Sequence, residues 1–388
     1  MGRRVPFLIG RIVGGDRGCF INWMRGWEMK KSLQIAGAYI GLIVGAGFAS
    51  GQEILQFFTG FGLYGFIGIA IAGLLFAFLG MHVVKTGSIL RITSYKRIFY
   101  RFCGQYLGAP VDVFVTFFLF GVGAVMIAGS GSLFEQQFGF DPMIGNIIMA
   151  TLVFATLILN VEKVVTVISL VAPYLFVLIL AITGYAIFWG EWKGESLQAG
   201  SAILPKAAPN FLAGSFLYVS YNISAGVAML AIIGGTAKDE RIAGRGGILG
   251  GVGLGLLILL LHIAMLINVE KIAEFPMPTL RLATEISPVV GWMSGIALLG
   301  MIYNTAVGML YAFTTRFIMP GTKKFKIGVA VIVLLALVSS RIGFVDLVGT
   351  VYPVSGYLGM TVIIAIFIHW FRGRRRPLNV DTDPSIKG

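Results

Sequence analysis

The stretch IAGAYIGLIVGAGFASGQEILQF, residues Ile35 to Phe57, decides how the whole chain is read. One unbroken helix from Ser32 to Thr59 would be about 42 Å long at ~1.5 Å per residue, well beyond a hydrocarbon core of roughly 30 Å. The glycines at positions 45, 47 and 51 each lower helix propensity by about 1 kcal/mol relative to alanine. We therefore predict two half-helices that meet near the middle of a membrane, with unwound backbone between them.

Polar residues in the same stretch favour this break. Ser50, Gln52 and Glu53 place polar groups at a depth where lipid would penalise them. Unwound backbone at membrane depth is tolerated only where protein buries it or where it lines a wet cavity, so a broken span indicates a binding site. The alternative is a glycine-rich face that packs closely against another helix.

The composition is that of an all-α polytopic membrane protein. Of 388 residues, 57% are hydrophobic and 12% are charged, and 53 are glycine. The net charge of +13 resides in loops and tails, where the positive-inside rule explains it, so we predict a lipid bilayer and no nucleic acid as partner. Cys19 and Cys103 both fall in predicted cytoplasmic segments, which makes a disulfide unexpected, and no metal-ligand spacing is present.

The hydrophobic pattern predicts ten spans, with spans 1 and 6 discontinuous. We divide the chain into a basic tail (1–31, of which the first 28 residues are a possible mis-called start), a first repeat of five helices (32–190), an extracellular linker (191–210), a second repeat of five (211–371) and a basic tail (372–388). Spans 2 to 10 are expected at 63–85, 110–133, 143–161, 164–189, 211–235, 248–268, 288–318, 325–341 and 345–371. An interfacial helix is expected at 90–104.

Charge sets the predicted orientation. By our division, the side that holds both termini carries about 25 of the 30 Lys and Arg residues, which makes that side cytoplasmic. The two sets of spans are offset by roughly 180 residues, and the second weak point, Tyr221 to Gly226, matches the first. Because five is an odd number, the second set must cross in the opposite sense, which is the inverted repeat of many secondary transporters.

Half-helix ends expose backbone N–H groups that attract anions and C=O groups that attract cations. The candidate substrate contacts are therefore the residues at the two weak points: the backbone of Ala46, Gly47 and Phe48, and the side chains of Ser50, Gln52, Tyr221, Asn222 and Ser224. The alternative for Ser50, Tyr221 and Ser224 is hydrogen bonding between packed helices.

Glu53 is the sharpest single candidate. A carboxyl group one to two turns from the midplane must be paired, protonated or hydrated. It could bind a coupling proton, neutralise a substrate ammonium group, or cap free amides at the start of the second half-helix. On span 8, Asn304 and Thr305 interrupt an apolar run and offer oxygens suited to a monovalent cation, unless their own helix backbone satisfies them.

Three motifs resemble those of the YkvI-like family of bacterial membrane proteins: GAGFASGQE (Gly45 to Glu53), the preceding MKKSLQIAGAYIG, and YVSYNIS in span 6. The resemblance covers residues 29–371. That family is similar to the amino acid–polyamine–organocation superfamily, which implies the five-plus-five inverted repeat of LeuT-type transporters.

The same resemblance implies a sodium site. It would take carbonyl groups of Gly41, Val44 and Met301 and side-chain oxygens of Asn304 and Thr305. The LeuT-type pattern usually has two hydroxyl residues in span 8, whereas the first here is Asn304, so proton coupling through Glu53 stays open beside sodium coupling.

The sequence thus favours a secondary transporter, a sodium- or proton-coupled symporter of amino acids or related small zwitterions in the bacterial cell membrane. The alternative is a receptor that binds a small molecule in the same cleft without moving it. No nucleophile–base pair or phosphate loop has suitable spacing, so neither an enzyme nor a cofactor beyond Na⁺ or H⁺ is predicted.

Overall fold

The computed structural model describes residues 17–91, 108–159, 171–189, 201, 203–237 and 239–375, and every regular element in these ranges is a helix. The elements are, in chain order, α1 (Arg17–Ile43), α2 (Ala46–Ser50), α3 (Gln52–Phe57), the 3-10 helix η2 (Thr59–Phe61), α4 (Tyr64–Ile89), α6 (Gly108–Phe138), α7 (Pro142–Leu159), α9 (Val171–Trp189), α11 (Phe211–Gly235), α12 (Glu240–Ile267), α13 (Val269–Ile272), α14 (Pro278–Ile286), α15 (Pro288–Phe317), α16 (Lys323–Ser339), the 3-10 helix η3 (Ser340–Ile342) and α17 (Phe344–Arg375).

Several of these helices are long and apolar enough to cross a membrane. In the described ranges they are α4, α6, α11, α12, α15, α16 and α17, and two shorter apolar stretches lie in α7 and α9. Many of their large apolar side chains are exposed on the surface of the protein, among them Leu74, Ile296 and Ile327. The predicted class, an all-helical multi-pass membrane protein, is confirmed.

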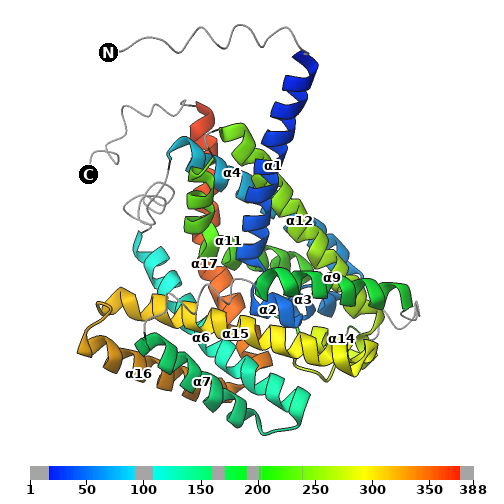
Figure 1. The fold of residues 1–388 in the computed structure, drawn as a ribbon, viewed down its shortest axis with the longest axis vertical. Helices are drawn as coiled ribbons and strands as arrows, with labels where there is room; N and C mark the ends of the chain where they lie inside the picture. Colours follow the sequence, from blue (N-terminus) through cyan, green and yellow to red (C-terminus); the bar gives the residue numbers. More distant parts are fainter. Residues whose placement is uncertain are drawn as a thin grey trace.

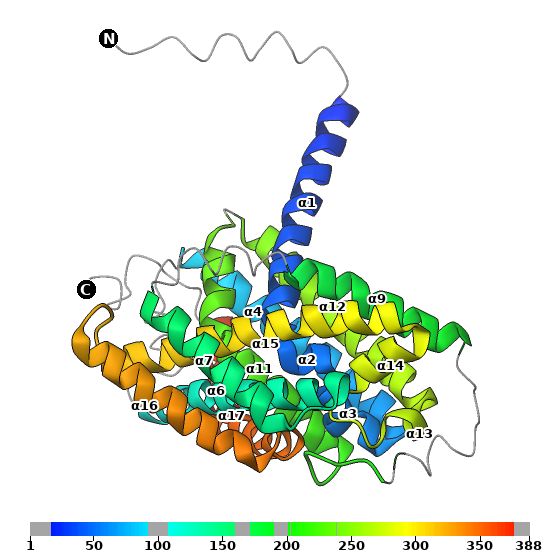
Figure 2. The same ribbon diagram turned by 60° about the horizontal axis from the view of Figure 1, so that its bottom comes forward.

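The helices pack in two groups joined by α17. In the first group α4 contacts both α11 and α12, and α1 contacts α12; in the second, α6 contacts α7 and α15, and α7 contacts α16. Helix α17 packs against α11 of the first group and α6 of the second. Figure 1 shows the short helices α2 and α3 near the middle of the molecule, and Figure 2 shows α15 passing across α2. The interruption in the first span is therefore enclosed by both groups.

At Gly251, the contact between α4 and α12 brings the two backbones directly together. A Cβ atom added to Gly251 of α12 would lie 2.2 Å from the backbone nitrogen of Ala77 on α4. A glycine is required there because only its missing side chain lets the two backbones approach so closely.

Capping side chains fix where several helices begin. Asn210 accepts a hydrogen bond from the amide of Ala213 at 2.8 Å, and Asp239 accepts one from the amide of Arg241 at 2.7 Å. The second cap starts α12 at Glu240, so the predicted start of span 7 at position 248 is too late. The apolar pattern missed the first two turns because they contain Glu240, Arg241 and Arg245.

The predicted tail is also too long. Helix α1 begins at Arg17, so residues 17–31 belong to a helix rather than to a basic tail, and α17 extends to Arg375 beyond the predicted end of span 10. The predicted interfacial helix at 90–104, the start of span 5 and most of the linker at 191–210 lie outside the described residues. The part of the linker that is described packs inward, with Leu204 buried and the amide of Ala207 bonded to the carbonyl of Gln56 at 3.1 Å.

The predicted break in span 6 is wrong, because α11 is one continuous helix from Phe211 to Gly235. Its polar residues stabilise helix packing instead. Ser220 donates to the carbonyl of Gly356 on α17 at 2.7 Å, and a Cβ atom on Gly359 would lie 2.9 Å from the Ser220 hydroxyl. This is the packing role that hydroxyl groups often have between membrane helices.

Candidate functional site

The first span changes direction at two points. Helix α1 ends at Ile43, and Gly45 has an extended backbone with φ −100° and ψ −171°. After α2, Gly51 adopts φ +83°, the left-handed region that favours glycine, and α3 begins at Gln52. Every residue of α2 and α3 is buried, so the interruption lies inside the protein and away from lipid.

Backbone groups at the second turn are paired within the chain. The amide of Gly51 donates to the carbonyl of Phe48 at 3.0 Å. Ser50 donates through Oγ to the carbonyl of Gly47 at 2.8 Å and accepts at 3.2 Å from the amide of Gln52. The hydroxyl of Ser50, a predicted substrate contact, thus stabilises the turn in this conformation.

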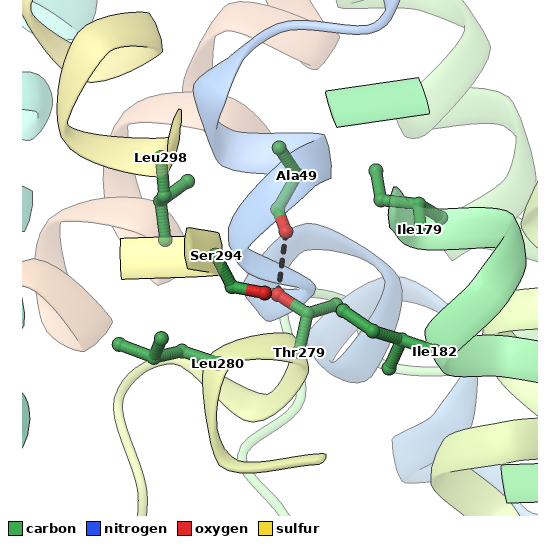
Figure 3. A pocket seen from close by; sticks show the side chains of 7 residues that line it. All are labelled: Ala49, Ile179, Ile182, Thr279, Leu280, Ser294 and Leu298. Carbon is green, nitrogen blue, oxygen red and sulfur yellow. Dashed lines mark hydrogen bonds between the residues drawn. The ribbon is translucent and has the colours of Figure 1, made fainter. Parts of the chain in front are cut away.

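Helix α14 closes one side of the interruption. The hydroxyl of Thr279 donates to the carbonyl of Ala49 at 2.5 Å, which Figure 3 shows as a dashed line. Just before α14, the backbone of Met277 exchanges two hydrogen bonds with the side chain of Gln136 on α6, at 3.0 and 3.1 Å. Helix α14 therefore links α2 to α6, and hence the broken span to the second group of helices.

A small cavity lies beside this contact, between α2, α9, α14 and α15. Its water-accessible volume is about 10 Å³, roughly the room that one water molecule needs. The residues that line it are Ala49, Ile179, Ile182, Thr279, Leu280, Ser294 and Leu298. Figure 3 shows the Ser294 hydroxyl beside that of Thr279, and the Ser294 oxygen is buried with no hydrogen-bond partner among the described residues. This side of the interruption is closed to anything the size of an amino acid.

The carboxyl group of Glu53 lies on the inner face of the interruption. Tyr221 of α11 donates to its Oε2 atom at 2.6 Å, and the hydroxyl of Tyr352 on α17 faces the same carboxyl group. A Cβ atom on Gly47 would lie 1.9 Å from Glu53 Oε1 and 2.9 Å from Tyr352 Oη. Gly47 is thus needed because the carboxyl group occupies the space where any side chain would begin.

Aromatic rings surround this carboxyl group. The ring of Tyr221 lies 4.9 Å from that of Tyr352, 5.4 Å from that of Tyr218 and 5.9 Å from that of Phe57, measured between centroids. Glu53 is 6% exposed, Tyr221 is 2% and Tyr352 is 3%. The hydroxyl of Tyr218 is buried without a hydrogen-bond partner among the described residues.

The other predicted substrate contacts are spread around this cluster. Ala46 and Phe48 are buried in α2, and the amide oxygen of Gln52 is buried without a partner in the described part of the chain. On α11, Asn222 donates to the carbonyl of Tyr218 at 3.0 Å, and Ser224 donates to the carbonyl of Gly359 at 3.0 Å. Tyr221 meets Glu53, whereas Asn222 and Ser224 would have to change partners to reach a solute.

The five predicted sodium ligands differ in their exposure, and the sodium site stays a prediction. Val44 and Met301 are buried, Thr305 is half-buried, and Gly41 and Asn304 are exposed. A Cβ atom added to Gly41 would meet no atom within 4 Å. Elsewhere in the described ranges, no three His, Cys, Asp or Glu side chains gather as metal ligands would.

Sequence analysis missed two residues of this site, Tyr352 and Thr279. Tyr352 precedes Pro353 on the last helix, and Thr279 lies at the start of the short helix α14 between two spans. Neither residue stands out locally, since each becomes recognisable only through its contact with the broken span.

Known proteins similar to this chain were found by sequence and by structure. No protein-family model matches the chain. Over 333 residues it is 28% identical to the uncharacterized membrane protein YkvI of Bacillus subtilis (strain 168), covering 86% of this chain and 94% of YkvI. It is also 24% identical over 331 residues to the protein YyaD of the same organism, with 85% and 94% coverage. The resemblance to YkvI expected from the three motifs is thus confirmed.

Solved structures show the fold. The inward-facing conformation of Mhp1 superposes with a TM-score of 0.64 at 15% identity, covering 89% of this chain and 77% of Mhp1. The fold is of the LeuT type. The same fold relates the chain to MhsT in complex with L-phenylalanine (TM-score 0.54, 16% identity, 87% and 98% coverage). It also relates the chain to a manganese transporter of Eremococcus coleocola (TM-score 0.51, 14% identity, 88% and 79% coverage).

Proposed function

We propose that this LeuT-type protein is a secondary active transporter, an ion-coupled symporter of amino acids or related small zwitterions. It has ten spans in a five-plus-five inverted repeat, both termini in the cytoplasm, and works by alternating access. We propose no enzymatic activity and no cofactor other than the coupling ion. The observation that carries this proposal is the interrupted first span, which brings the buried carboxyl group of Glu53 to the junction of α3, α11 and α17.

Two features support transport. A buried ionisable residue inside a membrane protein commonly marks a substrate or ion pathway, and Glu53 is one. A transporter and an amino-acid complex are among the solved structures that share the fold. The closed cavity beside Thr279 suits a state in which that side of the site is shut.

Reconstitution tests the proposal directly. The purified protein is placed in liposomes and offered a mixture of radiolabelled amino acids under a sodium gradient, a proton gradient, or neither. We expect saturable uptake that depends on one gradient and is absent from liposomes without protein. Binding of a labelled amino acid with no flux under either gradient would instead indicate the receptor.

A further inference from the structure

In the described part of the chain, no positively charged side chain pairs with Glu53. The titratable groups that face it are phenols: Tyr218 and Tyr221 on α11, and Tyr352 on α17. Helix α3 packs against α2, η2, α11, α12 and α17, and within the described residues no charged side chain of these elements acts on the Glu53 carboxyl group. A carboxylate buried without a cationic partner is costly, so the carboxyl group should be neutralised by a bound cation whenever the site is closed.

The packing decides which cation fits this conformation. The carboxyl group is in contact with Tyr221, with the Cα side of Gly47 and with the Tyr352 hydroxyl, and all three residues are buried. The cavity beside Thr279 is not lined by Glu53. A metal ion would need several oxygen ligands around it, and an ammonium group would need a cavity of its own. A proton needs neither a shell of oxygen ligands nor a cavity.

Resting on the proposed function, we propose that Glu53 carries the coupling proton and that Tyr221 and Tyr352 are positioning residues that hold its carboxyl group over Gly47. The step is reversible formation of one O–H bond. When the site is open to one side, the carboxylate takes a proton from a hydronium ion, whose O–H bond breaks and leaves a water molecule. When the site is open to the other side, the acid O–H bond breaks and the proton goes to a water molecule, which becomes hydronium. The two phenol groups keep the carboxyl group in one place between these events.

Proton binding can be measured without knowing the transported solute. Infrared difference spectra of the purified protein in lipid, recorded between high and low pH, report carboxyl protonation through the C=O stretching band of the acid. Because the chain has 17 Asp and Glu residues, several carboxyl bands will titrate, and we expect one of those seen in the wild type to be missing in Glu53→Gln. In Tyr352→Phe and Tyr221→Phe the carboxylate loses an O–H group nearby, so the proton should bind about tenfold more tightly.

Tyr39→Phe is the matched control. Tyr39 is fully buried and donates to the carbonyl of Phe76 at 3.0 Å, so the substitution removes the same kind of hydroxyl group away from Glu53. Its carboxyl band should titrate as in the wild type. Identical difference spectra in wild type and Glu53→Gln would overturn the proposal, and so would equal shifts in all three tyrosine variants.

Uptake of the same radiolabelled amino-acid mixture separates the two proposals. We expect Glu53→Gln to lower proton-driven uptake at least tenfold while uptake down the solute gradient persists. Sodium-driven uptake that Glu53→Gln leaves unchanged would reject Glu53 as the coupling site and keep the transporter. If the wild type moves no labelled solute under any gradient, the proposed function fails, and the infrared titration alone still decides whether Glu53 is the proton site.

Discussion

At the scale of single residues, the main feature of the site is the contact between the Glu53 carboxyl group and Gly47. The sequence predicted backbone of Ala46, Gly47 and Phe48 open to a solute, but the structure has the Glu53 carboxyl group covering Gly47. The importance of Glu53 could be predicted, since a carboxylate in an apolar span is conspicuous. Its partner Tyr352 could not, because a tyrosine on an apolar helix has many ordinary roles and only the fold brings it to Glu53.

Substituting Gly47 tests this contact. In Gly47→Ala the new methyl group would meet Glu53 Oε1, so the carboxyl group must move, and we expect a loss of about 1–3 kcal/mol in stability from overpacking. The measurement is thermal unfolding in detergent followed by tryptophan fluorescence. Gly45→Ala is the control, because a Cβ atom there meets nothing within 4 Å and the backbone is extended. Equal losses in the two variants would contradict the contact as we describe it.

At the scale of elements, the two predicted weak points behave differently for a local reason. The first contains Gly45 and Gly51, whose backbone angles leave the helix, whereas the second offers only Gly226 after a run of residues that can remain helical. Polar composition alone therefore predicted a break in α11 that does not occur. Ser220 and Ser224 donate instead to backbone carbonyls of α17, and the sequence pattern did not show that this helix packs on α11.

Helix α14 is linked to α2 by a hydrogen bond from Thr279, which a side chain of the same shape can remove. Thr279→Val deletes the bond to the Ala49 carbonyl, which is worth about 1 kcal/mol, or roughly a fivefold change in an equilibrium. We expect this variant to open the small cavity more often. The readout is the labelling rate of Ser294→Cys by a membrane-impermeant maleimide, with Cys19 and Cys103 replaced by serine, and it should rise severalfold.

The matched control for this labelling is Thr284→Val. Thr284 lies on the same helix and donates to the carbonyl of Leu280 at 2.9 Å within that helix, so its loss breaks no link to α2. Its labelling rate should equal that of the background. A Thr279→Val variant that labels no faster than this control would show that α14 is held by other contacts.

At the scale of the whole molecule, the all-helical membrane class could be predicted from the apolar pattern, and the LeuT-type fold was implied by the resemblance to the YkvI-like family. Helix ends were less accurate. The first turns of α12 are charged and therefore have low hydropathy, so they were assigned to a loop. The cap by Asp239 marks the true start of the helix.

Orientation is the prediction that belongs to the whole molecule. With about 25 of 30 basic residues on the side of the termini, a green fluorescent protein fused to the C-terminus should fluoresce and an alkaline phosphatase in the same place should be inactive. A phosphatase fused after residue 195, in the predicted extracellular linker, should be active. The reverse pattern of activities would invert the proposed topology.

The backbone contact between α4 and α12 has a mechanical consequence. Where Gly251 rests on Ala77, no layer of side chains remains that could change rotamer and absorb a small displacement. A tilt of one helix is thus passed directly to the other, and α1, which packs on α12, is carried along. We therefore expect these three helices to tilt as one rigid body, with bending confined to Gly45 and Gly51, where the backbone leaves the helix.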